Sequence, residues 1–315
     1  MNPTVAQSVG VDIAKDTLDV AILPAGESFR LANDSEGHRA LVKRLARLDI
    51  ARIVFEATGA YHRLFQQALA KAGLPFVKVN PRRARRFAEA AGKLAKTDRC
   101  DALILARMGS ALELEPCLPA SETALAMKEL VGARDALIKD RVAALNRQAV
   151  ALDPLVKRQI GQRLRQIDRQ IKAIDKRLKT LRGADPGLAM RGDIITSIPG
   201  FADASANALI VEAPELGRLD NAQAGSLVGL APIARDSGKT HGRRSIRGGR
   251  PRARRALYMP ALNAIRFNPE FKAKYQAMIK AGKPPKVAIV AVMRKLFILA
   301  NALIRDQRKW TPEAP

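Results

Sequence analysis

The chain has 315 residues, of which 47% are hydrophobic, and it carries 55 Lys and Arg against 30 Asp and Glu, a formal net charge of +25. This apolar content supports a packed core and excludes a disordered basic tail. The positive charge exceeds what solubility requires, so it indicates a polyanionic partner, and nucleic acid is favoured over a membrane because no long amphipathic anchor is evident. Only 4% of the residues are aromatic, so we expect contacts to phosphates to dominate over base stacking.

The cysteines and histidines exclude two further classes of protein. Cys100 and Cys117 are the only cysteines, and together with three histidines they have no zinc-ligand spacing and imply no disulfide framework. The first residues lack a signal-peptide pattern, and no apolar run reaches about 18 residues, the length of a membrane span. We therefore expect a cytoplasmic protein with no membrane partner.

The stretch from residue 8 to residue 22 predicts two short strands. Apolar residues at 9, 11 and 13 flank Asp12, and Leu18, Val20 and Ile22 alternate after a polar turn. Asp12 then lies where the first strand ends. Burying a lone carboxylate is costly, whereas several carboxylates can share a divalent cation. The alternative is an Asp that only caps a turn.

Residues 5–110 alternate between strand-like and helix-like stretches, which predicts a mixed or parallel sheet with packed helices. Glu56 directly follows the strand-like segment 51–55, at the strand edge where open α/β sheets gather functional groups; a solvated strand-end charge is the alternative. The expected strands are 7–13, 17–23, 27–32, 51–55 and 74–79, and the expected helices are 35–47, 60–72 and 81–91.

The segment Lys-Thr-Asp98-Arg-Cys-Asp101-Ala opens another helical pattern, with Thr97 or Asp98 as its cap. Asp98 and Asp101 share one helical face, and their mutual repulsion predicts a shared cation or a basic partner. Capping alone would explain Asp98 but not Asp101. Upstream lies a cluster of four arginines, for which a phosphate-binding edge and a solvated face are both open: Arg82, Arg83, Arg85 and Arg86.

From about residue 121 to 182 the pattern becomes helical. Asp153-Pro154 resembles a cap followed by a first-turn proline, so we expect two helices of about 40 Å to meet there and form an oligomerisation arm. In the second helix the apolar residues follow a heptad spacing: Ile160, Leu164, Ile167, Ile171, Ile174, Leu178 and Leu181. The first helix repeats less strictly, through Leu130, Leu137, Val142, Leu145, Ala149 and Leu152.

The last third combines helices with a basic, glycine-rich loop. Residues 194–211 resemble a helix-hairpin-helix element with Asp203 as a cap, and an ordinary helical hairpin is the alternative. Segments 256–268 and 286–305 are predicted to be core helices. Between them and the hairpin, Ser237 is a candidate nucleophile, although most loop serines only form turns. The loop cations include Lys239, Arg243, Arg244, Arg247 and Arg250, which suit phosphate binding.

Taken together, these motifs resemble the DEDD insertion-sequence transposases, the IS-one-ten family, which is related to the Piv invertases. The resemblance extends over about residues 7–305. It implies an α/β plus all-α fold: a RuvC-like (RNase H-like) mixed sheet with flanking helices in residues 1–115, a helical coiled-coil arm in 116–186, and a helical C-terminal transposase domain in 187–308, followed by a tail, 309–315.

The resemblance also implies a site-specific DNA recombinase. Asp12, Glu56, Asp98 and Asp101 would hold Mg²⁺, and Ser237 would form a phosphoserine link to DNA. The implied partners are donor and target DNA, a structured non-coding (bridge) RNA, and further copies of the chain in a homodimer or homotetramer.

Two other functions compete with this one. One is a RuvC-like metal-dependent nuclease or Holliday-junction resolvase with a structural Ser237, and the other is a non-catalytic nucleic-acid-binding scaffold. Ser245 lies in similarly basic surroundings, so the choice of Ser237 rests on the motif.

Overall fold

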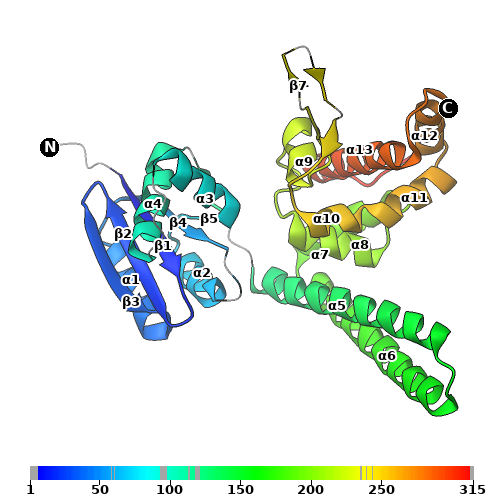
Figure 1. The fold of residues 1–315 in the computed structure, drawn as a ribbon, viewed down its shortest axis with the longest axis horizontal. Coiled ribbons are helices and arrows are strands. Elements are labelled where there is room, and N and C mark those ends of the chain that lie inside the picture. Colours follow the sequence, from blue (N-terminus) through cyan, green and yellow to red (C-terminus); the bar gives the residue numbers. More distant parts are fainter. Residues whose placement is uncertain are drawn as a thin grey trace. The chain divides into compact units, whose positions relative to one another are not determined.

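The computed structural model divides the chain into two compact units, Met1–Pro119 and Ala120–Pro315, and each is described by itself (Figure 1). The residues that the structure describes are 6–57, 59, 61–92, 98–112, 114–117, 121–234, 236–238, 240–242 and 244–312, without the side chains of 98, 99, 240 and 241.

The first unit is a five-stranded mixed sheet, as predicted. The first three strands form an antiparallel meander, and the last two run parallel to β1. Helices α1 (Ser35–Leu45) and α2 (His62–Lys71) make the connections into β4 and β5. In sheet order the strands are β3 (Glu27–Ala32), β2 (Thr17–Leu23), β1 (Gln7–Ile13), β4 (Ile50–Glu56) and β5 (Phe76–Val79).

The alternation of side chains along the strands produces two packed faces. On one face, Val11 of β1 and Phe55 of β4 are fully buried in a cluster with residues of α1 and α2. On the other face, Val54 packs with Leu105 of α4 (Asp98–Ala111) and with Ala84 of α3 (Pro81–Ala90). The sheet is therefore covered on both sides, and α4 lies on the face to which every second residue of β1 points.

The second unit begins with an antiparallel hairpin of α5 (Glu122–Val150) and α6 (Pro154–Ala184). On α6 the predicted apolar seam is confirmed: Ile167 and Leu178 are buried, and the others are half-buried. The base of this arm joins the core of the remaining helices, because Met127 and Val131 of α5 are buried in the same cluster as Leu296 of α13 (Pro285–Arg305).

On α5 the predicted seam is wrong beyond Leu137. Val142, Leu145 and Leu152 are 51%, 38% and 89% exposed, whereas Ala144 is buried. Charged residues take part in the contact instead. Arg134 and Arg141 of α5 turn toward α6, where their Nε atoms donate to Asp175 (2.7 Å) and Asp168 (2.8 Å).

The rest of the second unit is a helical core. Its central helix is α13, and Val292, Leu296 and Phe297 of that helix are buried. By length and composition α13 could also cross a membrane, with a mean hydropathy of 2.1, although half of that segment is buried in the fold. The helices are α7 (Pro186–Ser197), α8 (Asp203–Glu212), α9 (Asn221–Leu227), α10 (Pro251–Ala256), α11 (Tyr258–Phe267), α12 (Pro269–Lys280) and α13 (Pro285–Arg305).

Two local expectations differ from the structure in this unit. Asp203 begins α8 instead of capping it, because Ala202 is the cap and its backbone is bound by the Ser205 hydroxyl; the Asp203 carboxylate accepts from Arg182 at 2.7 Å. Trp310 lies within the expected tail, yet its side chain packs on the core and its backbone N–H donates to Ser197 Oγ at 2.8 Å.

Candidate active site

The sheet brings Asp12 and Glu56 to the same edge. Val11 of β1 is in register with Phe55 of the parallel strand β4, so Asp12 and Glu56 occupy the next positions on adjacent strands. Both side chains are half-buried. Because Val11 and Phe55 point into the α1 and α2 face, the following residues lie on the opposite face, which α4 covers. Two carboxylates from separate segments therefore lie side by side.

Helix α4 runs antiparallel to β1 on this face. Ser8 Oγ donates to Ala106 O at 2.9 Å, and a Cβ added to Gly10 would lie 2.0 Å from Ala102 O. The contacts thus move toward the start of α4 as β1 proceeds toward Asp12. Two further residues of β1 advance about 6.6 Å, which corresponds to about four residues of helix. This places the first turn of α4, the segment from Asp98 to Asp101, opposite the end of β1.

The donor set at this edge fits a hard divalent cation, because it consists of carboxylate oxygens, the ligands that Mg²⁺ prefers. The structure describes the side chains of Asp12, Glu56 and Asp101, whereas the carboxylate of Asp98 lies outside the described part. Among the side chains that the structure describes, no three acidic, His or Cys groups form a closed metal site. The support for a metal is therefore the arrangement of the two strand ends and α4.

A further carboxylate at this edge was missed by the sequence analysis. Asp19 of β2 is the direct register partner of Asp12, and it is only 7% exposed. Arg30 of β3 is its register partner on the other side and binds it through Nε–Oδ1 (3.0 Å) and Nη2–Oδ2 (2.9 Å). Arg30 thus balances the charge of Asp19 beside Asp12. The sequence did contain a signal for this residue: apolar residues alternate at 18, 20 and 22, which predicts that Asp19 faces away from the main core.

The arginines of α3 lie near the same edge. Glu56 is in register with Val79, the last residue of β5, and α3 starts two residues later, where the Asn80 side chain accepts from Arg82 N at 2.9 Å. All four arginines of the cluster are exposed, and one of them, Arg85, pairs with Glu89 at 3.2 Å. The helix start therefore adds positive charge beside the carboxylates.

In the second unit, Ser237 lies beside the tip of a β-hairpin. β7 (Asp236–Ser237) pairs with β8 (Thr240–His241), and Ser237 is opposite Thr240 across a two-residue turn. Gly238 has φ +53°, and no atom lies within 4 Å of a Cβ built there. The Ser237 side chain is exposed. The sequence analysis predicted a loop here, and the structure shows paired strands.

The other serine, Ser245, lies farther from the tip of the hairpin. Ser245 belongs to β9 (Ser245–Ile246), where it pairs with Ile233 of β6 (Pro232–Ile233). Its side chain is also exposed. Of the two serines, Ser237 is the one beside the tip.

Two glycines close the neck of this hairpin. A Cβ on Gly249 would lie 2.2 Å from Gly229 N, and both residues have positive φ. Arg254 of α10 holds the two sides together, since its Nη1 donates to Gly248 O at 2.8 Å and to Val228 O at 3.3 Å. The hairpin therefore leaves the helical core through a tightly packed base.

The predicted phosphate-binding cations of this hairpin differ in their surroundings. Arg244 and Arg247 are exposed, whereas Lys239 and Arg243 lie outside the described residues. Arg250 makes a bidentate pair with Glu215 (2.6 and 2.7 Å) and donates to Glu212 O. Burial by itself would raise the pKa of Glu215, but the hydrogen bonds and charge of Arg250 outweigh burial and lower that pKa.

Comparison with known families agrees with this arrangement. A transposase family model, the DEDD domain of the IS110 type, matches residues 9–156, and a second one, described as transposase of the IS116/IS110/IS902 family, matches residues 192–276. Together they cover more than two thirds of the chain. The chain belongs to the IS110 family of transposases. As an IS110 transposase it is an enzyme that cuts and rejoins DNA strands, and the α4 edge of the sheet lies within its DEDD region.

The similarity to known proteins covers most of the length of this IS110 transposase for some relatives and part of it for others. Pilin gene-inverting proteins of Moraxella lacunata and Moraxella bovis are each 28% identical over 312 residues, covering 95% of this chain and 96% of theirs. A 42 kDa protein of insertion element IS900 from Mycobacterium paratuberculosis is 32% identical over 124 residues, 38% of this chain and 31% of that protein.

Proposed function

We propose that this IS110 transposase is a site-specific recombinase that cuts DNA through a covalent phosphoserine intermediate at Ser237. The observation that carries the proposal is the shared edge of Asp12 and Glu56, with the start of α4 opposite it. Asp12, Glu56, Asp98 and Asp101 would hold Mg²⁺, which when bound polarises the scissile phosphate. The gene-inverting relatives support recombination between defined sites as the outcome.

The covalent step assigned to Ser237 is a transesterification. Its Oγ forms a bond to phosphorus and releases its proton to solvent, one P–O bond to a deoxyribose breaks, and the released oxygen takes up a proton. The energy of the phosphodiester is kept in the serine ester, so a second DNA end can reverse the step and be joined. Exposure beside the hairpin tip gives Ser237 the access that such an attack needs.

The proposed partners are donor and target DNA and a structured non-coding RNA that guides the choice of site. The net charge of +25 supports polyanionic partners of this size. We assign the arginines of α3, together with Lys239, Arg243, Arg244 and Arg247, to phosphate contacts. Arg250 we assign to positioning the hairpin, because Glu215 engages its guanidinium. The proposed location is the cytoplasm.

We further propose that the enzyme works as a homodimer or homotetramer through α5. The exposed apolar residues Ile138, Val142, Leu145 and Ala149 of α5 are spaced 4, 3 and 4, a second heptad series, and exposed Leu152 follows just beyond the end of the helix. They lie beside the face that contacts α6. An apolar stripe with helical spacing fits the same stripe of another copy, in the manner of a coiled coil.

The test of the strand chemistry is to trap the covalent intermediate. The full chain is incubated with Mg²⁺, its co-purifying RNA and DNA containing the junction of the element's ends, then denatured, and any DNA-linked peptide is mapped. We expect an adduct at Ser237 that is lost in Ser237→Ala and in Asp12→Asn, and that persists in Ser245→Ala, the matched serine control.

The competing functions give different results in the same experiment. Cut DNA without an adduct, unaffected by Ser237→Ala, would establish the metal-dependent nuclease and refute the serine chemistry. Bound but uncut DNA, with no effect of Asp12→Asn, would establish the scaffold. An adduct that moves to Ser245 would overturn the choice of Ser237.

A further inference from the structure

Helix α6 has a second regular series of residues on the side away from α5. Starting at Arg158, residues spaced 4, 3, 4, 3, 4 and 3 are basic at every position but one, over about 32 Å of helix. Each position of this series precedes a position of the apolar seam by two residues, about 200° around the helix, so the two series form opposite faces of α6. We call this series the α6 stripe: Arg158, Gln162, Arg165, Arg169, Lys172, Lys176 and Lys179.

The charge of the α6 stripe is not balanced within the arm. α6 has ten Lys and Arg against two acidic residues, both Asp, whereas α5 has five Lys and Arg against four Asp and Glu. Both aspartates, Asp168 and Asp175, are bound by arginines of α5. All stripe side chains are exposed, and in the described part of the chain none of its six cations forms an ion pair.

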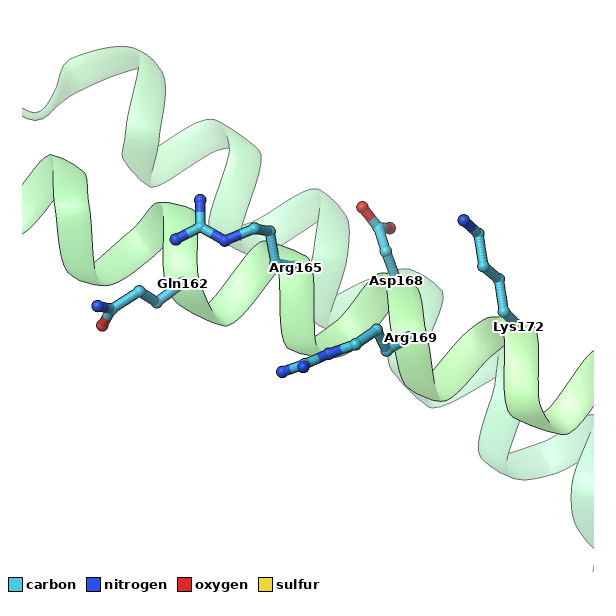
Figure 2. A pocket seen from close by; sticks show the side chains of 5 residues that line it. All are labelled: Gln162, Arg165, Asp168, Arg169 and Lys172. Carbon is cyan, nitrogen blue, oxygen red and sulfur yellow. The ribbon is translucent and has the colours of Figure 1, made fainter.

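The middle of the stripe is also where the surface is hollowed. A shallow depression of about 440 Å³ is lined by Gln162, Arg165, Asp168, Arg169 and Lys172. Figure 2 shows these side chains extending away from the α6 ribbon, with Arg165 and Lys172 on one side of the helix and Gln162 and Arg169 on the other. Amide, guanidinium and ammonium donors are therefore presented together along an open surface, and the one carboxylate among them, Asp168, is bound by Arg141 of α5.

These features select the kind of partner. A membrane surface needs apolar residues next to the charges along the whole length of the stripe. The residues flanking it include Gln159, Gln166 and Gln170, and the exposed large apolar residues of α6, Leu155 and Val156, lie only at its start. A long series of evenly spaced cations matches a polyanion with evenly spaced charges. Glutamine adds donors and acceptors that suit phosphate and sugar oxygens.

We propose that the α6 stripe is a separate binding site for the phosphodiester backbone of a nucleic acid duplex. The stripe shares no residue with the strand ends that carry Asp12 and Glu56 or with the hairpin that carries Ser237, and it binds nucleic acid independently of its sequence. This inference concerns binding only, so it stands apart from the strand chemistry proposed above, and it is measured without Mg²⁺, where that chemistry does not operate.

The test compares two variants of the full chain with equal loss of charge on the same arm. Arg165→Gln/Arg169→Gln removes two stripe cations, and Lys139→Gln/Arg147→Gln removes two exposed cations of α5. Glutamine keeps the helix propensity of both sites. Affinity for a DNA duplex and for an RNA stem-loop of unrelated sequence is measured between 50 and 200 mM salt by fluorescence anisotropy.

We expect the stripe variant to lower the slope of log affinity against log salt by about 1.8 for DNA, since each phosphate contact contributes about 0.9. Its loss of affinity over this salt range then becomes about tenfold smaller than that of the parent, while the α5 variant follows the parent. A change confined to DNA or to RNA would support the site and identify its source.

Three results would overturn the inference. They are equal changes in the two variants, no change in either, and binding of poly-glutamate as tight as that of the duplexes, which would indicate an acidic protein. Circular dichroism of both variants confirms that the helices are intact.

Discussion

Because α4 packs closely against β1 at Gly10, we expect Gly10→Ala to destabilise the fold strongly. An added Cβ would lie 2.0 Å from Ala102 O and 2.3 Å from Ala106 N, both backbone atoms of α4 that cannot rotate away. Restoring an ordinary contact of 3.4 Å requires α4 to move by about 1.4 Å. Overpacking of a core typically costs about 1–3 kcal/mol, and the need to shift a helix backbone places this change at the upper end.

The same displacement acts on the proposed site. Asp98 and Asp101 move with α4 while Asp12 stays with β1, and a misplacement of about 1 Å is enough to lower a rate by about a hundredfold. We therefore expect Gly10→Ala to unfold at lower urea and, where it is folded, to form the Ser237 adduct at least a hundredfold more slowly.

The control is Gly183→Ala in α6, where no atom lies within 4 Å of the built Cβ. It is expected to be neutral or to stabilise by up to about 1 kcal/mol, because Ala favours helix more than Gly does. Urea unfolding and adduct formation are measured on the two variants and the parent. If Gly10→Ala is as stable and as active as the control, α4 does not pack against β1 as described.

Three further predictions follow from other contacts. Arg250 lowers the pKa of Glu215 below its ordinary value of 4.5, so the ion pair stabilises the fold above that pH. Glu215→Gln is therefore expected to lower the melting temperature at pH 7. The difference in melting temperature between this variant and the parent is expected to shrink as the pH falls below about 4.5. Equal differences at pH 7 and pH 3 would contradict this. Arg254→Ala is expected to speed hydrogen exchange of the hairpin amides at 232–246, and unchanged exchange would show that the neck holds without it. Val142→Glu/Leu145→Glu is expected to abolish homo-oligomers in sedimentation while changing the stability of the single chain by less than about 0.5 kcal/mol; an intact oligomer would exclude this stripe.

Local patterns were enough to predict the sheet and the placement of two candidate ligands. Alternation of apolar residues located β1 and β2, and the apolar segment 51–55 located β4, and the strand ends followed directly from these patterns. The position of Glu56 beside Asp12 also follows once β1 and β4 are known to be parallel neighbours. These features depend on short-range periodicity, which the sequence records without reference to the rest of the fold.

The features that escaped prediction depend on partners distant in sequence. Where α5 contacts α6, Arg141 pairs with Asp168, 27 residues away, and no apolar periodicity reveals that an arginine occupies a contact position. Likewise, the pairing of Asp19 with Arg30 requires the register of two strands. The short strands of the serine hairpin have only two residues each, too few for a pattern to appear among glycines and arginines.

The position of α4 against β1 has a consequence for the order in which the protein is made. During synthesis at about 5–20 residues per second, Asp98 leaves the ribosome roughly 4–17 seconds after Asp12. Until α4 arrives, the face of β1 around Gly10 has no cover, so the nascent sheet is incomplete. The serine hairpin emerges later still. An unfinished chain therefore lacks first the start of α4 and then the hairpin that carries Ser237, so the strand chemistry proposed above requires the later part of the chain to have been made.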